Sequence, residues 1–413
     1  MSFFAPLLER REFSLARFAD WMDRGYTTSQ SGVDVNDQSA LTWPAVYGCV
    51  QVLSQDEAKT PLQVFRRLGR NGKDGREEAT DHPLSGIFKY AANPYTTAYQ
   101  FKQTMQKDLC VRGNAYALIY WDERGRTSSL WHRKPQYMCV EVKDGALRYK
   151  YDPCDGTPAE YYSYDQVFHL KGLSNDGIIG LSPVEIFREG IGLALAQQRH
   201  GLKTMQVGIR QPFGIKAPID SNPENAIRLG TEFAKAFGGV DNAGKVPFFY
   251  GGMEPVPLGF SNADAQYIES MQASFAQACS IWRVAPTKIM DFLRATFSNI
   301  TEVNISHVND TLRPHQENWE QEIHLKLLSE EERLVYYVEH NNYDLLKGTP
   351  RERAEIENSY VASGVSQINE VRGSHNWNPV PGGDRNRVQM QNVPLEAADA
   401  LAVQQPPQNK EKK

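Results

Sequence analysis

The first part of the chain alternates between apolar spacings typical of helices and of strands. From Thr42 to about Ala58, apolar side chains recur every three or four residues, which predicts a helix with one buried face. The composition also predicts a strand at 61–65, a short helix beginning at His82-Pro-Leu and a further helix over 101–111. These elements together predict a mixed helical and sheet body.

Residues 113–170 have the pattern of an antiparallel sheet. Short runs of strand-forming residues are separated by turns such as Asp122-Glu-Arg-Gly125, in which glycine tolerates a positive φ and aspartate caps its own turn. The predicted strands are 115–121, 129–132, 137–142, 147–151 and 166–170. Short antiparallel strands beside helices predict the α+β class.

The segment Asp176-Gly-Ile-Ile-Gly-Leu-Ser-Pro-Val-Glu185 marks the boundary between this sheet and a long helix. Its two glycines supply a turn, Ser182 occupies the N-cap position, Pro183 the first helical position and Glu185 the third. The helix is predicted from Val184 to about Val207, although three internal glycines weaken it.

A compact β-α-β insert is predicted next, with strands at 213–218 and 245–250 around a helix at 222–237. Ser261-Asn-Ala-Asp264 repeats the serine-to-acid spacing and opens a second long helix, to about Val284. The two long helices are therefore predicted to be antiparallel struts with the insert at their tip.

Ala285-Pro286 ends the second strut, and 287–300 is predicted to be a loop. A helical pattern runs from about Thr301 to Leu334, and Pro314 inside it predicts a kink or a split. Two short helices are predicted at 352–362 and 366–373. From about Leu401 the composition is that of a disordered tail.

The N-terminus differs from the rest. Its apolar start is too brief for a signal peptide, and residues 25–40 are polar and predicted to be flexible. Five apolar residues are spaced so that they could form one face of an amphipathic arm: Phe4, Leu7, Leu8, Phe18 and Trp21. We expect the arm to dock on the protein body or on a neighbouring subunit.

Composition narrows the function. A chain of 413 residues is too long for one core and predicts two or three domains. With 50 acidic against 45 basic residues, the net charge of −5 argues against a protein that holds nucleic acid tightly. Five cysteines without C-x-x-C spacing predict buried free thiols in a reducing cytoplasm. No apolar run is long enough to span a bilayer, so no membrane contact is expected.

Catalytic motifs are weak. Gly239-Val-Asp-Asn-Ala-Gly-Lys245 fits G-x-x-x-x-G-K, but Val246 replaces the Mg²⁺-binding hydroxyl and a helix precedes the loop where a P-loop has a strand. Ser182 lacks the second glycine of a nucleophile elbow. The histidines of one helical region, His307, His315 and His324, are interpreted as scattered polar-face residues. No active site, metal or cofactor is predicted, so the protein is not expected to be an enzyme.

Short motifs occur in a particular order between about Leu41 and Asp384. They are Val46-Tyr-Gly-Cys-Val50, Thr60-Pro-Leu62, His82-Pro-Leu84, Asn93-Pro94, Gly113-Asn-Ala-Tyr116, Asp176 to Pro183, Val284-Ala-Pro286, Ser298-Asn299, 364–372 and 379–384. Each is weak alone. In this order they resemble the portal proteins of tailed bacteriophages, of the HK97 type.

The resemblance implies a portal-type fold with an α+β wing at 41–181, after an N-terminal arm at 1–40. It implies stem helices at 182–207 and 262–284, a β-α-β clip at 208–261, a tunnel loop and kinked helix at 285–343, a helical crown at 344–394 and a disordered tail at 395–413. The tail is short and mixed in charge, whereas members of the family often have a longer or more acidic one.

The same resemblance implies a function. The chain would form a homo-oligomeric ring, usually of twelve subunits, at one capsid vertex, as the channel for packaging and ejection of double-stranded DNA. The large terminase subunit, the head–tail adaptor (connector) and the major capsid protein are the implied partners. The implied location is the virion, and the host cytoplasm during assembly.

Five loop residues are the candidates for contact with DNA: Asp291, Arg294, Thr296, Ser298 and Asn299. Arg294 is the obvious phosphate partner, and an inter-subunit salt bridge is an equal alternative. Modest acidity repeated around a ring would keep DNA sliding. Two other functions stay open: a nucleotide-dependent DNA-packaging enzyme built on 239–245, and a capsid-associated adaptor without a channel.

Overall fold

A computed structural model gives the fold. It describes residues 29–69, 75–143, 145–207, 213–216, 228, 230–232, 254–257, 263–289, 300–342, 345, 350–375 and 377–385. The chain divides into two compact units, Met1–Asn342 and Tyr343–Lys413. Helices and antiparallel strands both build the first unit, so the predicted α+β class is confirmed.

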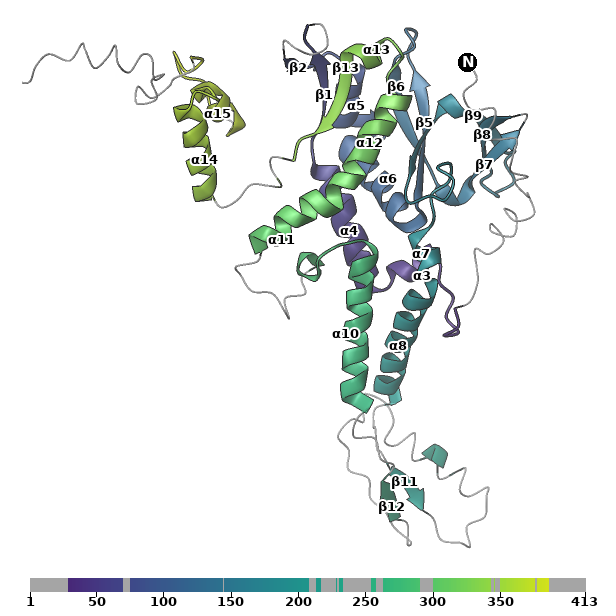
Figure 1. Cartoon of the computed structure of the whole chain (residues 1–413). Helices are drawn as coiled ribbons and strands as arrows, with labels where there is room; N and C mark the ends of the chain where they lie inside the picture. The colour runs from purple at the N-terminus through teal and green to yellow at the C-terminus, as the bar shows by residue number, and fades with distance from the viewer. Residues whose placement is uncertain are drawn as a thin grey trace, which may run out of the picture. The chain divides into compact units, whose positions relative to one another are not determined.

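Three helices near the N-terminal end of the first unit form where the sequence predicts them: α4 (Pro44–Lys59), α5 (Pro83–Lys89) and α6 (Ala98–Arg112). The predicted flexibility of residues 25–40 is wrong at its C-terminal end, because α3 (Asp37–Leu41) begins there with a capping box at Asn36. The Thr97 side chain caps α6 by accepting from the Gln100 amide, and Gly113 ends the helix with a left-handed φ of 68°. Helices α4 and α6 pack against each other beneath the sheets (Figure 1).

The strands pair antiparallel, but they form separate small sheets and not one large sheet. Three sheets have three strands each, in the orders β13-β1-β2, β10-β5-β6 and β7-β8-β9. The strands are β1 (Leu62–Arg67), β2 (Arg76–Glu78), β3 (Ala91–Asn93), β4 (Thr96–Thr97), β5 (Asn114–Trp121), β6 (Thr127–Arg133), β7 (Met138–Lys143), β8 (Ala146–Tyr151), β9 (Glu160–Ser163), β10 (Val167–Lys171) and β13 (Tyr336–His340). The sequence patterns did not predict β2, β3, β4, β9 or β13.

The predicted helix over 301–334 is wrong at its C-terminal end. The chain forms α11 (Ile300–Ser306), a π-helical segment η8 (His307–Leu312) and α12 (Arg313–Lys326), then a short α13 (Glu332–Val335). The Arg313 amide donates to the Val308 carbonyl five residues back. This wider turn directly precedes Pro314, which lacks an amide hydrogen, so the predicted interruption is confirmed.

The main core lies between α5, α6 and α12 and the sheets. Trp319 of α12 is fully buried against Phe101 and Phe168, with ring centroids 6.5 and 5.7 Å away. The indole Nε1 of Trp319 donates to Gln106 at 3.0 Å, so this large side chain is buried without leaving its polar atom unpaired.

A buried asparagine holds the turn that joins the sheets to the first long helix. Asn114 Oδ1 accepts from the Gly180 amide at 2.8 Å and pairs with His169 Nε2 at 3.0 Å, and Nδ2 donates to the Gly180 carbonyl at 2.7 Å. The backbones at Gly113 and Gly180 approach each other very closely. A Cβ on Gly113 would overlap the Leu181 carbonyl, and a Cβ on Gly180 would overlap the Gly113 carbonyl. Only glycine fits at both positions.

The long helix begins as predicted but is interrupted once. Ser182 caps α7 (Pro183–Ile186) by accepting from the Glu185 amide at 3.3 Å, and its hydroxyl donates to the Val111 carbonyl at 3.0 Å. After Phe187 the chain continues as α8 (Arg188–Val207). The first turn is therefore fastened to the end of α6.

Helix α8 lies beside α10 (Ala263–Ile281), as the two predicted struts (Figure 1). Gln197 bridges them, donating to Ser270 at 2.5 Å and accepting from Ser274 at 3.1 Å. In the predicted insert, β11 (Phe213–Lys216) pairs antiparallel with β12 (Glu254–Pro257). The predicted strand at 245–250 lies outside the described residues, as does most of the predicted helix at 222–237.

The second unit contains α14 (Pro350–Ala362) and α15 (Ile368–Ser374), close to the predicted bounds. Asn369 ties the start of α15 to the following loop, because its side chain accepts from the Val380 amide at 2.8 Å and donates to Asp384 at 2.8 Å. In the described part of the chain, no helix is long and apolar enough to cross a membrane.

All five cysteines are free thiols, but they are not all buried. Cys49, Cys110 and Cys279 are buried between α4, α6 and α10, as predicted. Cys139 is half-buried and Cys154 is exposed, so the prediction of buried thiols is wrong for Cys154. Cys154 lies in the connection between β8 and β9 at a left-handed φ of 57°, a turn that leaves its side chain in solvent.

Candidate functional site

The five predicted loop residues, Asp291 to Asn299, lie outside the described residues. The structure describes the two segments that flank them. On the N-terminal side is the 3-10 turn η6 (Pro286–Ile289), and on the C-terminal side is the start of α11. The candidate site therefore consists of these two flanks and the residues that hold them in place.

The end of α10 fixes the first flank. Trp282 is buried, and its Nε1 donates to the Cys110 carbonyl at 2.9 Å. The Val284 amide donates to the Cys279 carbonyl and the Arg283 amide to the Ser280 carbonyl, which together form a Schellman cap. Arg283 takes the left-handed position, φ 54°, which glycine usually occupies. A backbone strain of about 1 kcal/mol is thus retained beside the loop.

Helix α4 holds both flanks. On the first, Ile289 packs against Gly48, where a Cβ would lie 3.0 Å from the Ile289 Cγ2 atom. On the second, His307 Nε2 lies 2.8 Å from Asp56 Oδ2, and both side chains are buried. Gly48 and Asp56 are eight positions apart on one helix, so α4 sets the separation between the two ends of the loop.

The charges around Asp56 favour its ionised form. Burial acts to raise its pKa, but hydrogen bonds from His307 and Lys59 outweigh burial and lower the pKa below its ordinary value. Burial lowers the pKa of the nearby Lys288, on η6, and Asp56 partly opposes that effect. The carboxylate of Asp56 therefore interacts with Lys59 of α4, Lys288 of η6 and the His307 ring of η8.

A cavity of about 290 Å³ opens beside the flanks. Its lining residues are Arg283, Ala285, Glu302, Val303, Ser306, His307 and Thr311. The Ser306 hydroxyl donates to Asp310 and the Thr311 hydroxyl to the Arg283 carbonyl, each at 2.7 Å. Ser306 thus pairs with an exposed carboxylate and Thr311 with a backbone carbonyl, so neither hydroxyl donates to a histidine.

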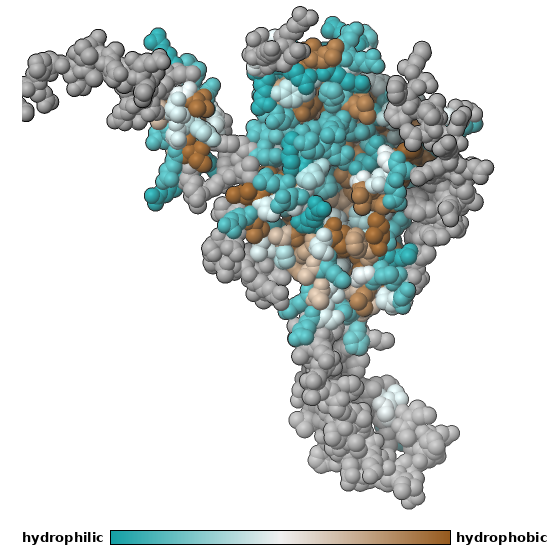
Figure 2. Space-filling view, in the orientation of Figure 1, coloured by the Kyte–Doolittle hydropathy of each residue, from teal (hydrophilic) through white to brown (hydrophobic). Residues whose placement is uncertain are grey.

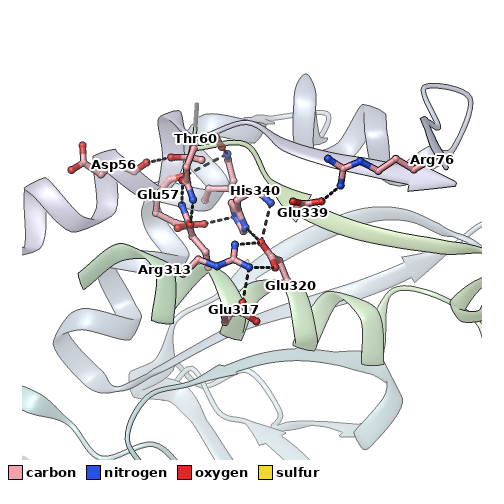
Figure 3. A network of polar contacts seen from close by, with 12 residues as sticks. Asp56, Glu57, Thr60, Arg76, Arg313, Glu317, Glu320, Glu339 and His340 are labelled. Atoms are coloured by element: carbon pink, nitrogen blue, oxygen red, sulfur yellow. Dashed lines mark hydrogen bonds and ion pairs between the residues drawn. The ribbon is translucent and has the colours of Figure 1, made fainter. Parts of the chain in front are cut away.

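A network of buried charges continues from α4 to α12 and β13 (Figure 3). His340 lies between two carboxylates, with Nε2 2.8 Å from Glu57 Oε1 and Nδ1 2.8 Å from Glu320 Oε1. The contact with Glu57 is an ion pair without an aligned hydrogen bond, whereas Glu320 accepts from both the ring and the His340 amide. Arg313 forms a further ion pair with Glu320, with Nη1 3.1 Å from Oε1.

Burial and the neighbouring charges act in opposite directions on the titratable groups of this network. Burial disfavours the charged ring, but Glu57 and Glu320 together raise the pKa of His340 above its ordinary value. Burial lowers the pKa of the neighbouring Lys102 to about 8, partly opposed by Glu57. Lys102 donates to the Thr60 carbonyl at 2.7 Å, at the end of α4. The network therefore joins the helix that holds the loop flanks to the β13-β1-β2 sheet.

Sequence reasoning missed these residues. His307 was interpreted as a polar-face residue, but it is buried and paired with Asp56, so that interpretation is wrong. Asp56 and His307 lie 251 positions apart in the sequence, and no local pattern reveals such a pair. The only available signal was the adjacent pair Asp56-Glu57 near the end of an otherwise apolar helix face.

The structure bears on metal binding and on the motifs that resemble catalytic ones. Within the described ranges, no group of three or more His, Cys, Asp or Glu is placed to hold a metal ion. The Walker-like segment, Gly239 to Lys245, lies outside those ranges. Ser182, the residue that resembled a nucleophile, is occupied as a helix cap.

Comparison with known proteins agrees with this architecture. Many solved structures share the fold, and two of them illustrate the likeness. One is an HK97 family phage portal protein from Corynebacterium diphtheriae, with a TM-score of 0.54 at 16% identity over 79% of this chain and 99% of that chain. The other is a chain from the neck of a native gene transfer agent particle computed with C12 symmetry, with a TM-score of 0.53 at 17% identity over 83% of this chain and 92% of that chain. The fold is that of a portal protein.

The sequence comparison identifies the family, whereas the structural comparison shows only the fold. The family model described as phage portal protein matches residues 44–376, and the chain belongs to this family. The portal protein of Enterobacteria phage HK97 is 28% identical over 366 residues, which cover 87% of this chain and 85% of that protein. Portal proteins are structural, non-enzymatic proteins of phage particles, which leaves the nucleotide-dependent enzyme without support.

Proposed function

We propose that the chain assembles into a ring of about twelve copies at one capsid vertex and forms the channel through which double-stranded DNA enters and leaves. The observation that carries this proposal is the pair of antiparallel helices, α8 and α10, fastened to the body at one end and connected to the β11–β12 pair at the other. Such rigid struts can line a conduit when they repeat around an axis. The C12 symmetry of the gene transfer agent neck supports this ring size.

The parts of the fold receive roles within this proposal. The sheets and helices of 41–181 are the wing, α8 and α10 the stem, 208–261 the clip and 344–394 the crown. The tunnel loop is then 285–300, within the tunnel loop and kinked helix of 285–343, and Ile289 and His307 hold this region on α4. Anchoring on one helix would let the loop keep its position against passing DNA while its tip adapts.

The clip would meet the large terminase subunit during packaging and the head–tail adaptor afterwards, and the wing would face the major capsid protein. The protein would assemble in the host cytoplasm and remain in the virion. These partners are proposed on the basis of family membership.

Electron microscopy of the purified full chain tests the ring. Annular particles with a central opening are expected, held by contacts of roughly 1,000 Å² or more between neighbours. Particles without a central opening would favour the adaptor without a channel. A strict monomer at every protein and salt concentration, also in the presence of phage scaffold, would contradict both.

The loop is tested by Arg294→Glu. If Arg294 faces DNA, packaged DNA should fall while rings still form, because a carboxylate replaces a phosphate-binding cation. Arg351→Glu, the same charge change on the exposed face of α14, is the matched control. Loss of the ring in Arg294→Glu alone would instead place Arg294 in a subunit interface.

A further inference from the structure

An exposed apolar strip follows the junction of α7 and α8. Leu173, Ile186, Phe187 and Leu193 are 78, 52, 44 and 49% exposed. Ile186 ends α7, Phe187 is its C-cap residue, and Leu193 lies in the second turn of α8. Figure 2 shows hydrophobic surface gathered where the long helices meet the body. Single exposed apolar residues are ordinary, but several at one helix junction, here Ile186, Phe187 and Leu193, indicate a surface that another segment covers.

The first described residues of the chain lie directly beside this strip. Ser29 is 3% exposed and packs so tightly on Gly192 that a Cβ at position 192 would overlap its side chain. The Gln30 amide donates to Glu189 Oε2 at 2.9 Å. The chain therefore reaches α8 one residue away from Leu193, and the preceding 28 residues begin from that fixed point.

Residues 1–28 have the composition of a segment that covers an apolar surface. Their apolar residues include Phe4, Leu7, Leu8, Phe13, Phe18 and Trp21. Their charges balance, with arginines at 10, 11, 17 and 24 against acids at 9, 12, 20 and 23. A neutral, aromatic-rich segment meets no electrostatic barrier on α8, where Arg188 and Glu189 are adjacent.

We propose that residues 1–28 dock on the apolar strip of Leu173, Ile186, Phe187 and Leu193 in the same chain. The tether at Ser29 makes this binding intramolecular, so the arm meets the strip at an effective concentration in the millimolar range. A docked arm would cover the junction between wing and stem and brace the interruption of the helix at Phe187. This role does not depend on the ring.

Limited trypsin digestion of the full chain tests the proposal, with cleavage at Arg10, Arg11, Arg17 and Arg24 followed by mass spectrometry. In the variant Ile186→Ser/Leu193→Ser, cleavage at these four sites should accelerate about tenfold or more, because two apolar anchors of the arm are lost. Leu334→Ser removes an 80% exposed leucine from α13 and is the matched control. Circular dichroism verifies that both variants fold.

A reciprocal measurement uses the arm. Phe18→Ser/Trp21→Ser should raise hydrogen exchange in a peptide spanning 183–195 several-fold and leave a peptide over β5 unchanged. Equal cleavage rates in wild type and the Ile186→Ser/Leu193→Ser variant would overturn the proposal. Protection of the arm that grows with protein concentration would overturn the assignment to the same chain and place the arm on a neighbour.

Discussion

Replacing Asn114 by alanine should destabilise the body of the protein by about 3–5 kcal/mol. The Asn114 amide is buried and makes contacts with Gly180 at both its N–H and its carbonyl, with His169 Nε2 and with the Arg112 carbonyl at 3.1 Å. Each hydrogen bond contributes about 1 kcal/mol net, and partners left buried and unpaired add to the loss.

The neighbouring histidine cannot compensate by changing its charge. Burial holds the pKa of His169 well below its ordinary value, so the ring stays neutral. Its Nε2–H donates to Asn114 Oδ1, while Nδ1 faces the Tyr149 hydroxyl at 3.2 Å. In Asn114→Ala this Nε2–H loses its acceptor in a site closed to water.

Urea denaturation followed by circular dichroism measures the loss. Asn114→Asp is the informative second variant, because it keeps the acceptor for Gly180 and His169 but sets a carboxylate oxygen against two backbone carbonyls. It should destabilise at least as much as Asn114→Ala. Asn341→Ala, on an exposed amide that bonds Gln63 at 3.3 Å, should change the unfolding free energy by about 0.5 kcal/mol or less. A loss below about 1 kcal/mol in Asn114→Ala would refute the reasoning.

Three further variants test other features. Gly180→Ala should prevent the turn from closing on Gly113 and cost about 3 kcal/mol or more, seen as a lower melting temperature, whereas an unchanged melting temperature would contradict the close backbone approach. Arg283→Gly should raise stability by about 0.5–1 kcal/mol in the same measurement, because it relieves the left-handed φ of 54°; destabilisation would mean that the guanidinium contributes more than the strain costs. His340→Gln should change the pH dependence of unfolding. Because its two carboxylates raise the pKa of folded His340, the charged ring stabilises the fold fully below the unfolded value of about 6.5 and loses this contribution as pH rises through the folded pKa. The stability gap between wild type and His340→Gln should therefore narrow from pH 6 to pH 8, and a constant gap would show that His340 does not titrate differently on folding.

Local patterns predicted the helices well where caps and periodicity agree. The start of α7 followed from Ser182 and Pro183, and the interruption before α12 followed from Pro314. In each case the cause lies within one turn of the residue concerned, so a single sequence contains it. The exact form of the interruption, a π-helical segment paired with Asp56, was not contained there.

The strand β13 shows the limit of such reasoning. The helical pattern was predicted to run through Leu334, and the residues Tyr336 to His340 come directly after it. The sequence contains no clear signal there that a strand begins. The segment becomes a strand because it pairs with β1, where Val338 lies opposite Val64, and because Val338 and His340 are buried there. The stabilisation comes from strand β1, more than 270 positions away in the sequence. The intrinsic secondary-structure propensity of the segment does not outweigh this pairing.

The sequence by itself determined the class, the order of parts and the family, because these depend on local periodicity, turn residues and motif order. Only the tertiary structure decided which residues cooperate at the loop flanks. Asp56 with His307, and Glu57 with His340 and Glu320, come together through packing of α4, η8, α12 and β13. In this buried cluster the hydrogen bonds and charges of the partners lower the pKa values of Asp56 and Glu320 and raise that of His340, against the effect of burial. These partners meet only in the folded chain.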